Sequence, residues 1–236
     1  MNFTEGEYIY INKPYGMTSF GALAYARTRV SRKIGVRRVK MGHAGTLDPL
    51  ATGVLILCTG RKTKEIEQLQ LHSKEYTATL QLGATTPSYD MEHPVDKTFP
   101  MQHISRELIE EKLRTFEGDI QQVPPQYSAV KIGGDRAYDL KRKGIEVELK
   151  AKTVHIERIE LTDFDEEKML MSIRVECGKG TYIRSLARDI GNALGSGAYL
   201  TALSRTRLGS VRIEDCVTID GFQQWLDSQE IETSSK

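Results

Sequence analysis

The sequence predicts a mixed α/β protein, because runs with strand-like and helix-like patterns share one chain. Residues 74–82 alternate apolar and polar side chains, which is typical of a half-buried strand. Residues 53–59 form an apolar run of the length expected for a buried strand. Residues 105–116 carry apolar side chains at helical spacing behind Ser105, a favourable helix cap. The composition agrees, since the 236 residues are 39% hydrophobic and 28% charged, as in ordinary globular proteins.

The first part of the chain predicts a strand, a turn and a helix. Residues 7–11 alternate as a short strand, and residues 12–19 follow as a turn rich in small residues. Ser19 is placed to cap a helix that runs to about Lys33. Its expected buried positions are Leu23, Ala24, Ala26 and Val30.

Residues 42–60 are the most informative stretch. Residues 42–49 predict a loop of small residues whose only ionisable side chains are His43 and Asp48, and the buried strand 53–59 anchors it. Pro49 restricts the backbone of Asp48 to extended geometry, which partly presets the direction of the carboxylate. Such a loop can present a catalytic acid, although Asp-Pro and Gly are also common in plain turns.

The remaining elements follow from local patterns. A short helix at 61–71 precedes the strand 74–82, whose apolar face carries Tyr76 and whose polar face begins with Lys74 and Thr77. A tyrosine on an apolar face is more often core than ligand. The other expected elements are a long polar loop at 83–102, the helix 105–116, a short basic helix at 136–143, strands at 152–161 and 169–177, a helix ending near Gly195 and a short helix around 221–228.

Two arginines on the helix that ends near Gly195 have an ambiguous pattern. Arg184 and Arg188 are four residues apart, so they lie on one face of a helix. Taken alone, this spacing predicts an ordinary basic stripe that faces solvent.

Composition excludes several classes of protein. No apolar run approaches the ~20 residues that span a membrane, and the first residues lack the basic and apolar regions of a secretory signal. The cysteines Cys58, Cys177 and Cys216 show no paired metal-ligand spacing, so we expect reduced thiols, no metal and a cytoplasmic location. The net charge is only +1, but between Ser31 and Lys64 Asp48 is the only acid. This basic surplus favours a nucleic acid as partner.

Several ordered motifs resemble the TruB family of pseudouridine synthases, which make pseudouridine-55 in the T loop of tRNA. The strongest is Gly-His-Ala-Gly-Thr-Leu-Asp-Pro-Leu-Ala-Thr-Gly-Val-Leu from Gly42, which resembles the signature loop of the family. The others are Lys-Pro-Tyr-Gly-Met-Thr-Ser from Lys13, Lys-Glu-Tyr from Lys74, the stretch 123–131, Gly-Thr-Tyr-Ile-Arg from Gly180 and Tyr-Leu-Thr-Ala-Leu-Ser-Arg-Thr from Tyr199. The resemblance runs from about Tyr8 to Val211.

The resemblance implies roles for particular residues. Asp48 would be the catalytic aspartate, Tyr76 would stack on the target base, and Arg184 would pair with Asp48. The residues implied to contact the substrate are His43, Lys64, Tyr76, Lys131, Tyr182 and Leu203. Lys13 and Pro14 would pack beneath the catalytic loop without a chemical role. The family chemistry implies no cofactor and no metal.

The resemblance also implies an architecture and a partner. The expected fold is α/β (α+β), a long mixed and mostly antiparallel sheet with flanking helices and a central catalytic cleft. Residues 1–213 would be the catalytic domain, and residues 214–236 a short acidic segment in place of the PUA-type domain of many relatives. The expected substrate is the T stem-loop of tRNA, bound by a monomer without an obligatory protein partner or membrane. Ser204 and Lys62 depart from the usual Arg and Ala of the family.

Other classes remain as alternatives. A non-catalytic RNA chaperone on the same fold would not need Asp48 and Arg184, which are both present. An aspartyl phosphotransferase would need a phosphate-binding glycine loop or a second acidic cluster, and neither motif is found. Within the family, the branch that modifies rRNA with guide RNAs is the nearest alternative. Whether Asp48 attacks the sugar or first removes a sugar proton is left open.

Overall fold

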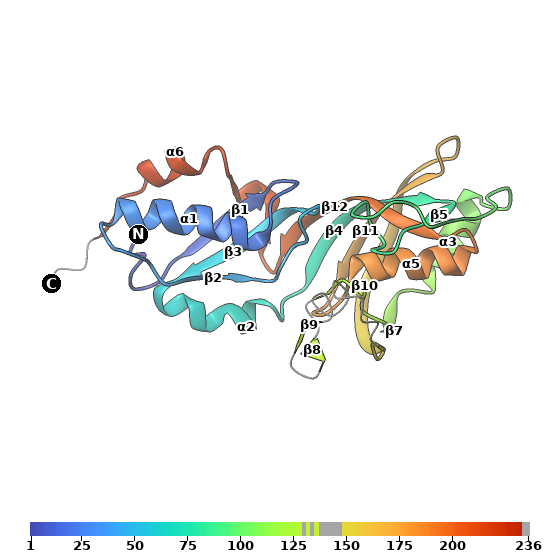
Figure 1. Ribbon diagram of the computed structural model, residues 1–236, viewed down its shortest axis with the longest axis horizontal. Coiled ribbons are helices and arrows are strands. Elements are labelled where there is room, and N and C mark those ends of the chain that lie inside the picture. The colour runs from blue at the N-terminus through green and yellow to red at the C-terminus, as the bar shows by residue number, and fades with distance from the viewer. Residues whose placement is uncertain (129–130, 133–134, 137–147, 233–236) are drawn as a thin grey trace. The chain divides into compact units, whose positions relative to one another are not determined.

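A computed structural model describes residues 1–128, 131–132, 135–136 and 148–232 (Figure 1). The chain divides into two compact units. The first unit combines Met1–Tyr76 with Ser204–Lys236, and the second is Thr77–Leu203. Among the described residues, every helix is too short or too polar to span a bilayer.

The first unit is built around one central strand. Its strands are β1 (Tyr8–Lys13), β2 (Met41–Ala44), β3 (Thr52–Thr59), β13 (Val211–Arg212), β14 (Val217–Thr218) and the end of β12 (Ala198–Leu208). They are ordered β14-β1-β3-β12, with β2 paired to β3 and β13 to β12. β3 runs antiparallel to β1 and β2 and parallel to β12. Neighbours on both sides explain why β3 is buried along nearly its whole length.

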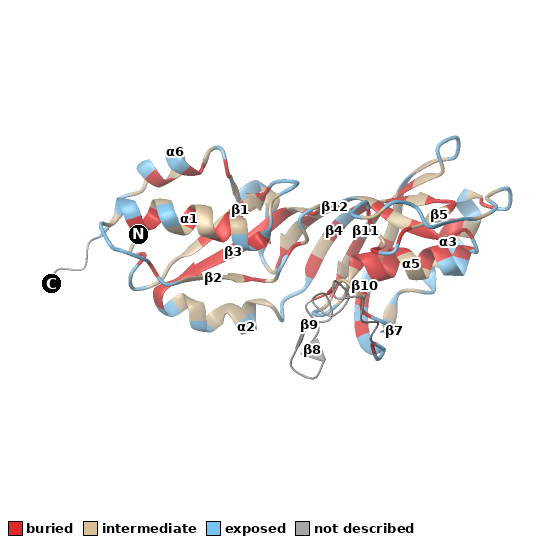
Figure 2. Ribbon diagram, in the orientation of Figure 1, coloured by how far each residue is buried: buried red, intermediate tan, exposed pale blue. Residues whose placement is uncertain are grey.

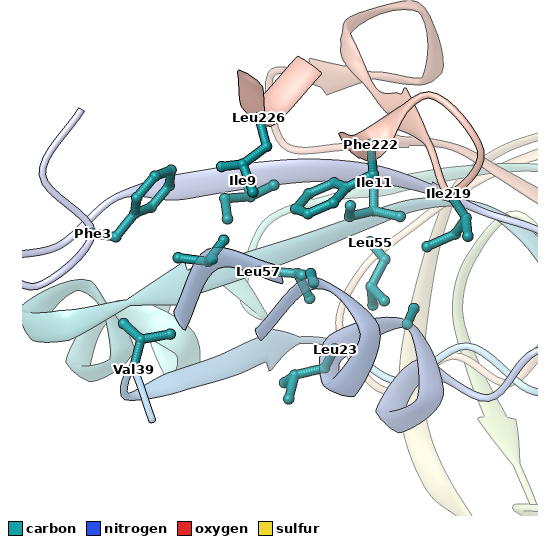
Figure 3. Packing of buried hydrophobic residues seen from close by; sticks show 13 residues of the cluster. Phe3, Ile9, Ile11, Leu23, Val39, Leu55, Leu57, Ile219, Phe222 and Leu226 are labelled. Carbon is teal, nitrogen blue, oxygen red and sulfur yellow. The ribbon is translucent and has the colours of Figure 1, made fainter. Parts of the chain in front are cut away.

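The helical elements of the first unit are α1 (Ser19–Lys33), η1 (Gly60–Glu65), α2 (Ile66–Leu69), η2 (Ile213–Asp215) and α6 (Phe222–Asp227). The apolar face of α1 packs on β1 and β3, and α6 closes the same core (Figure 3). Phe222 and Leu226 of α6 are fully buried there, beside Ile9, Ile11 and Leu57. The C-terminal segment therefore belongs to the hydrophobic core of the first unit.

The second unit is a largely antiparallel sheet with two helices. Its strands are most of β4 (Lys74–Leu82), β5 (Ala84–Thr85), β6 (Lys97–Thr98), β7 (Gly118–Gln122), β8 (Lys131–Ile132), β9 (Asp135–Arg136), β10 (Lys152–Asp165), β11 (Leu170–Cys177) and the first part of β12. The main sheet is ordered β12-β4-β11-β10-β7. The helices are α3 (Arg106–Arg114) and α5 (Ile183–Leu194), and Figure 2 shows a buried band along α5.

The predicted fold class is confirmed as a mixed α+β fold with a large mixed sheet and flanking helices. β1, β3, β4, α1, α3, α5 and α6 lie within a few residues of their predicted positions. Ser105 caps α3 as expected, because its side chain accepts a hydrogen bond from the Leu108 amide. Cys58 and Cys177 are buried, and all three cysteines are free thiols.

Three local predictions are wrong because tertiary contacts decide the outcome. Thr18, not Ser19, caps α1, because the Ser19 hydroxyl is bonded to the backbone of Leu47 instead. The predicted loop 42–49 begins as strand β2, which gains its hydrogen bonds from β3. Lys74 shares the buried face of β4 with Tyr76 rather than the polar face.

The helix predicted at 61–71 is the 3-10 turn η1 followed by the short α2. The segment 83–102 is not a plain loop, since it contains the β5–β6 pair and the buried side chains of Thr86, Ser88 and Asp90. Of the predicted basic helix 136–143, Arg136 lies in β9, and residues 137–143 lie outside the described residues.

Candidate active site

Asp48 lies in the connection between β2 and β3. Ser19 of α1 holds the centre of this connection. The Leu47 amide donates to Ser19 Oγ at 2.8 Å, and Ser19 Oγ donates to the Leu47 carbonyl at 2.9 Å. Asp48 itself is half-buried, and its carbonyl accepts from the Ala51 amide at 3.1 Å. The backbone on both sides of Asp48 is therefore fixed, which restricts where its carboxylate can lie.

Lys13 is a fully buried cation beneath the same loop. Its ammonium group donates to the carbonyls of Pro14 (2.9 Å), Met17 (2.6 Å) and Pro49 (3.3 Å). Burial lowers the pKa of Lys13 from 10.5 to about 8, while the charge of Asp48 acts in the opposite direction and raises it. Lys13 thus ties the β1–α1 turn to the residue after Asp48, in agreement with the packing role that the motif implies.

Arg205 of β12 is a second buried cation in this region, at 1% exposure. Its Nε donates to the Val54 carbonyl at 2.8 Å, and its Nη2 donates to the Gly45 carbonyl at 3.0 Å. A Cβ atom at Gly53 would lie 2.2 Å from the Arg205 carbonyl oxygen, and one at Gly45 would lie 3.3 Å from Arg205 Nη1. The close approach of the Arg205 backbone requires glycine at position 53, and the Arg205 side chain fixes both ends of the loop that holds Asp48.

His43 lies on β2, opposite Leu57 of β3. Burial, with a smaller contribution from the Arg205 charge, lowers the pKa of His43 below its ordinary value of 6.5. The imidazole is therefore neutral at pH 7. Its Nδ1 is buried and has no hydrogen-bond partner among the described residues. A neutral ring with a free nitrogen can take a hydrogen bond from a bound ligand.

The two other predicted residues of the first unit differ in exposure. Tyr76 is 7% exposed on the inner face of β4, as a core residue would be. Its predicted stacking role is therefore not visible from burial alone. Lys64 lies in η1 with an exposed side chain, where it can reach a phosphate group.

Arg184 is buried in the second unit, so the prediction of a solvent-facing stripe is wrong for this residue. It lies in the first turn of α5, and its Nε is 3.7 Å from the carboxylate of Asp90. Nη1 donates to the Ser88 carbonyl at 3.3 Å, and Nη2 to the Tyr127 carbonyl at 2.8 Å. The guanidinium is thus oriented from three sides. Sequence reasoning missed Asp90, because it lies in the segment predicted as a plain loop.

The other second-unit residues surround the start of α5 and the unit boundary. Tyr182 immediately precedes α5, and its amide donates to the buried Gln122 side chain at 2.8 Å. Leu203 is half-buried in β12. Lys131 lies in β8, and its side chain is outside what the structure describes.

The predicted site residues thus divide between the two units. His43, Asp48, Lys64 and Tyr76 belong to the first unit, and Lys131, Tyr182, Arg184 and Leu203 belong to the second. The structure brings Asp48 together with Lys13 and the Arg205–His43 pair. The pairing of Asp48 with Arg184 stays a prediction. Among the described residues there is no cluster of three side chains suited to a metal ion.

Two solved structures share this architecture, and one of them holds a substrate RNA. A solved complex of Cbf5, Nop10 and Gar1 matches with a TM-score of 0.68 and 29% identity, over 98% of this chain and 58% of that chain. An H/ACA RNP bound to a substrate RNA containing 2'-deoxyuridine matches with a TM-score of 0.66 and 26% identity, over 97% and 57%. This chain therefore spans somewhat more than half of those solved chains. The fold is shared with a protein that was solved bound to a substrate RNA.

Sequence comparison narrows the class to one family. The model of the TruB family pseudouridylate synthase N-terminal domain matches residues 32–183, and that of the tRNA pseudouridylate synthase B C-terminal domain matches residues 184–235. A tRNA pseudouridine synthase B of Phocaeicola vulgatus is 60% identical, over 98% of this chain and 98% of its own length. The chain belongs to the TruB family of pseudouridylate synthases, as the motifs predict.

Proposed function

We propose that the protein isomerises uridine to pseudouridine at position 55 in the T loop of tRNA. The observation that carries this proposal is the loop of Asp48, which is fixed by Ser19, Lys13 and Arg205. The near full-length similarity to a tRNA pseudouridine synthase B supports tRNA as the substrate. The Cbf5 complex with Nop10 and Gar1 resembles the chain at lower identity and over only part of the length of its matching chain.

The reaction exchanges one bond for another within a single nucleotide. The bond between N1 of the base and C1′ of the ribose breaks, the base turns, and a bond forms between C5 and C1′. The proton on C5 leaves and N1 regains a proton, so atoms and electrons balance. Asp48 serves as the ionised nucleophile or as the base that removes a sugar proton. The preset loop holds its carboxylate for either role.

The target uridine must leave its stack to reach Asp48, which costs a few kcal/mol. We assign Tyr76, Tyr182 and Leu203 to the pocket that takes the flipped base, with the neutral His43 as a hydrogen-bond acceptor or donor. The Tyr76 ring stacks on the uracil, and its hydroxyl is available for proton transfer. Arg184, already oriented by Asp90, pairs with Asp48 when RNA is bound. Lys64 and Lys131 contact phosphates.

The same proposal covers the organisation of the molecule. Residues 1–213 form the catalytic domain, and residues 214–236 are a short segment whose helix α6 completes the first unit. We expect a cytoplasmic monomer that acts on tRNA without an obligatory protein partner and without a cofactor.

The test is incubation of the purified chain with unmodified tRNA transcript, followed by mapping of pseudouridine along the RNA. We expect pseudouridine at position 55 and at no other uridine. A transcript in which uridine 55 is replaced by cytidine is the matched control. Modification of another uridine, or activity only with a guide RNA, would contradict the proposal.

A further inference from the structure

Two aromatic side chains stand in solvent beside the candidate active site. Phe20, in the first turn of α1, is 64% exposed, and Tyr15, in the preceding turn, is 57% exposed. The opposite face of α1 is well packed, with Ala22, Leu23 and Ala26 buried, so the helix does not need Phe20 for its core. Exposed positions recur along α1 (Figure 2). An exposed phenyl ring gives up the stabilisation of burial, which a polar residue would not.

An arginine lies over the exposed ring. The guanidinium carbon of Arg27 is 5.9 Å from the centroid of the Phe20 ring, two turns further along α1. An aromatic ring beside a guanidinium group combines a stacking surface for a base with a charge for a phosphate. Proteins that bind unpaired nucleotides use this combination.

The chain segment that contains this pair carries cations and no acidic residue. Residues 8–47 contain no Asp or Glu. The cations of the same stretch are Lys13, Arg27, Arg29, Arg32, Lys33, Arg37, Arg38 and Lys40. Of these, Arg32, Lys33, Arg37, Arg38 and Lys40 are exposed at and beyond the C-terminal end of α1, where Lys33 pairs with Asp227 at 3.0 Å. Such a one-signed stretch attracts a phosphate backbone and supports RNA as the occupant.

The aromatic pair is tied to the catalytic loop through the backbone. The amide of Gly16, next to Tyr15, donates to the Pro49 carbonyl at 2.9 Å. Ser19, next to Phe20, is bonded to Leu47 through its hydroxyl. Tyr15 directly precedes Gly16, Phe20 directly follows Ser19, and both of these neighbours are bonded to the loop of Asp48. RNA bound at Asp48 therefore lies within reach of the two rings.

We propose that Tyr15, Phe20 and Arg27 form a second base-binding surface, on which an unpaired base of the RNA substrate stacks outside the pocket for the target uridine. The proposal rests on the proposed function, since it takes the same RNA as ligand. Its role is to bind and orient the loop of the RNA, while the chemistry stays at Asp48.

The test measures single-turnover kinetics with unmodified tRNA over a range of enzyme concentrations. The variants are Phe20→Ala, Tyr15→Ala and Phe20→Trp, and Leu71→Ala is the control, because Leu71 is also an exposed apolar residue of the first unit, at 59%. We expect Phe20→Ala to raise the half-saturating concentration at least about five-fold, equivalent to stacking of about 1 kcal/mol. Phe20→Trp retains binding, and Leu71→Ala equals wild type.

A double-mutant cycle identifies the stacked base. Each unpaired loop nucleotide other than the target is replaced in turn by an abasic nucleotide. At one position the abasic RNA weakens binding to wild type, and Phe20→Ala then adds no further loss. Arg27→Gln lowers the slope of log affinity against log salt by about 0.7 to 0.9, as expected for the loss of one phosphate contact.

Two outcomes would overturn the inference. One is that Phe20→Ala, Leu71→Ala and wild type have the same half-saturating enzyme concentration. The other is a loss confined to the rate at saturating enzyme, which would place Phe20 in folding or chemistry. Direct measurement of tRNA binding by filter assay distinguishes a failure of this base-binding surface from a failure of the proposed function. If wild type binds tRNA but forms no pseudouridine, and Phe20→Ala still weakens binding, the proposed function fails and the surface stands.

Discussion

The guanidinium group of Arg205 donates a hydrogen bond to the Gly45 carbonyl across 3.0 Å, although 160 positions separate the two residues. Its second bond reaches the Val54 carbonyl at 2.8 Å. The two acceptors lie before and after Asp48, so one buried side chain fixes both ends of the loop. Arg205 is a positioning residue, because it acts on Asp48 only through the backbone.

The first prediction concerns Gly53, where β12 approaches β3 closely. Gly53→Ala places a Cβ against the Arg205 backbone at a φ of +103°. Strain and overpacking together are expected to lower the free energy of unfolding by about 3 kcal/mol. Gly35→Ala is the control, because Gly35 also has a positive φ but no atom within 4 Å of the added Cβ. Urea unfolding measures both, and equal losses would contradict the explanation by close approach.

Two substitutions of Arg205 separate the effect of its charge from the effect of its geometry. Arg205→Gln removes the charge that lowers the pKa of His43, so an NMR titration should show this pKa rising. Arg205→Lys keeps the charge but cannot replace the planar fork, so the His43 pKa stays low while the free energy of unfolding falls by about 3 kcal/mol. Arg207→Gln, which loses bonds to Ser73 and Gly209, is the matched control and leaves His43 unchanged. An unchanged His43 pKa in Arg205→Gln would refute the coupling.

Because the ammonium group of Lys13 is buried, we predict that the free energy of unfolding depends on pH in the alkaline range. Its pKa is about 8 in the folded protein against 10.5 for an ordinary lysine, so the unfolded chain binds more protons between these values. Stability from this group therefore rises as the pH increases from 8 to 10.5. The measurement is the difference in unfolding free energy between wild type and Lys13→Met across this range. Parallel pH curves would count against a buried ammonium group.

The same lysine reports on Asp48. Because the Asp48 charge raises the pKa of Lys13, Asp48→Asn should lower this pKa further. NMR of the lysine side chain detects the shift. A Lys13 pKa that does not respond would mean that the two groups are not coupled.

We predict that activity requires the geometry of the Arg184 guanidinium group as well as its charge. Arg184→Lys keeps a cation but cannot reach Asp90 and the carbonyls of Ser88 and Tyr127 together, so we expect single-turnover rates about 100-fold lower. Asp90→Asn keeps the shape of the partner and should lose activity with an unchanged fold by circular dichroism. Arg188→Gln is the control on the same helix. Full activity of Arg184→Lys would show that the orientation of the guanidinium is not needed.

The elements predicted correctly are those that local pattern determines. β4 has a strict alternation, and α3 and α5 have helical spacing with Ser105 as a cap or Gly195 as a left-handed end. β2 could not be recognised, because its four residues show no strand pattern and its strand form depends on pairing with β3. Ser19 and Thr18 are both competent caps, and only the contact with Leu47 decides between them.

A candidate site residue can be named from the sequence where a motif contains it, but not where only a distant contact gives it its role. Asp48 and Arg184 stand in long motifs, so they could be named from the sequence. The role of Arg205 has no local signal in the sequence, because its partners Gly45 and Val54 are far away along the chain. Asp90 gives no local signal of burial, since it lies in an irregular stretch without strand or helix periodicity.

The central claim is that Asp48 carries the chemistry, and Asp48→Asn tests it most directly. The variant and wild type are each incubated with unmodified tRNA, pseudouridine at position 55 is quantified in a single turnover, and tRNA affinity is measured in parallel. We predict no detectable pseudouridine from Asp48→Asn, with tRNA affinity within a few-fold of wild type and an unchanged unfolding midpoint. Pseudouridine formation by Asp48→Asn at a rate near that of wild type would contradict the account.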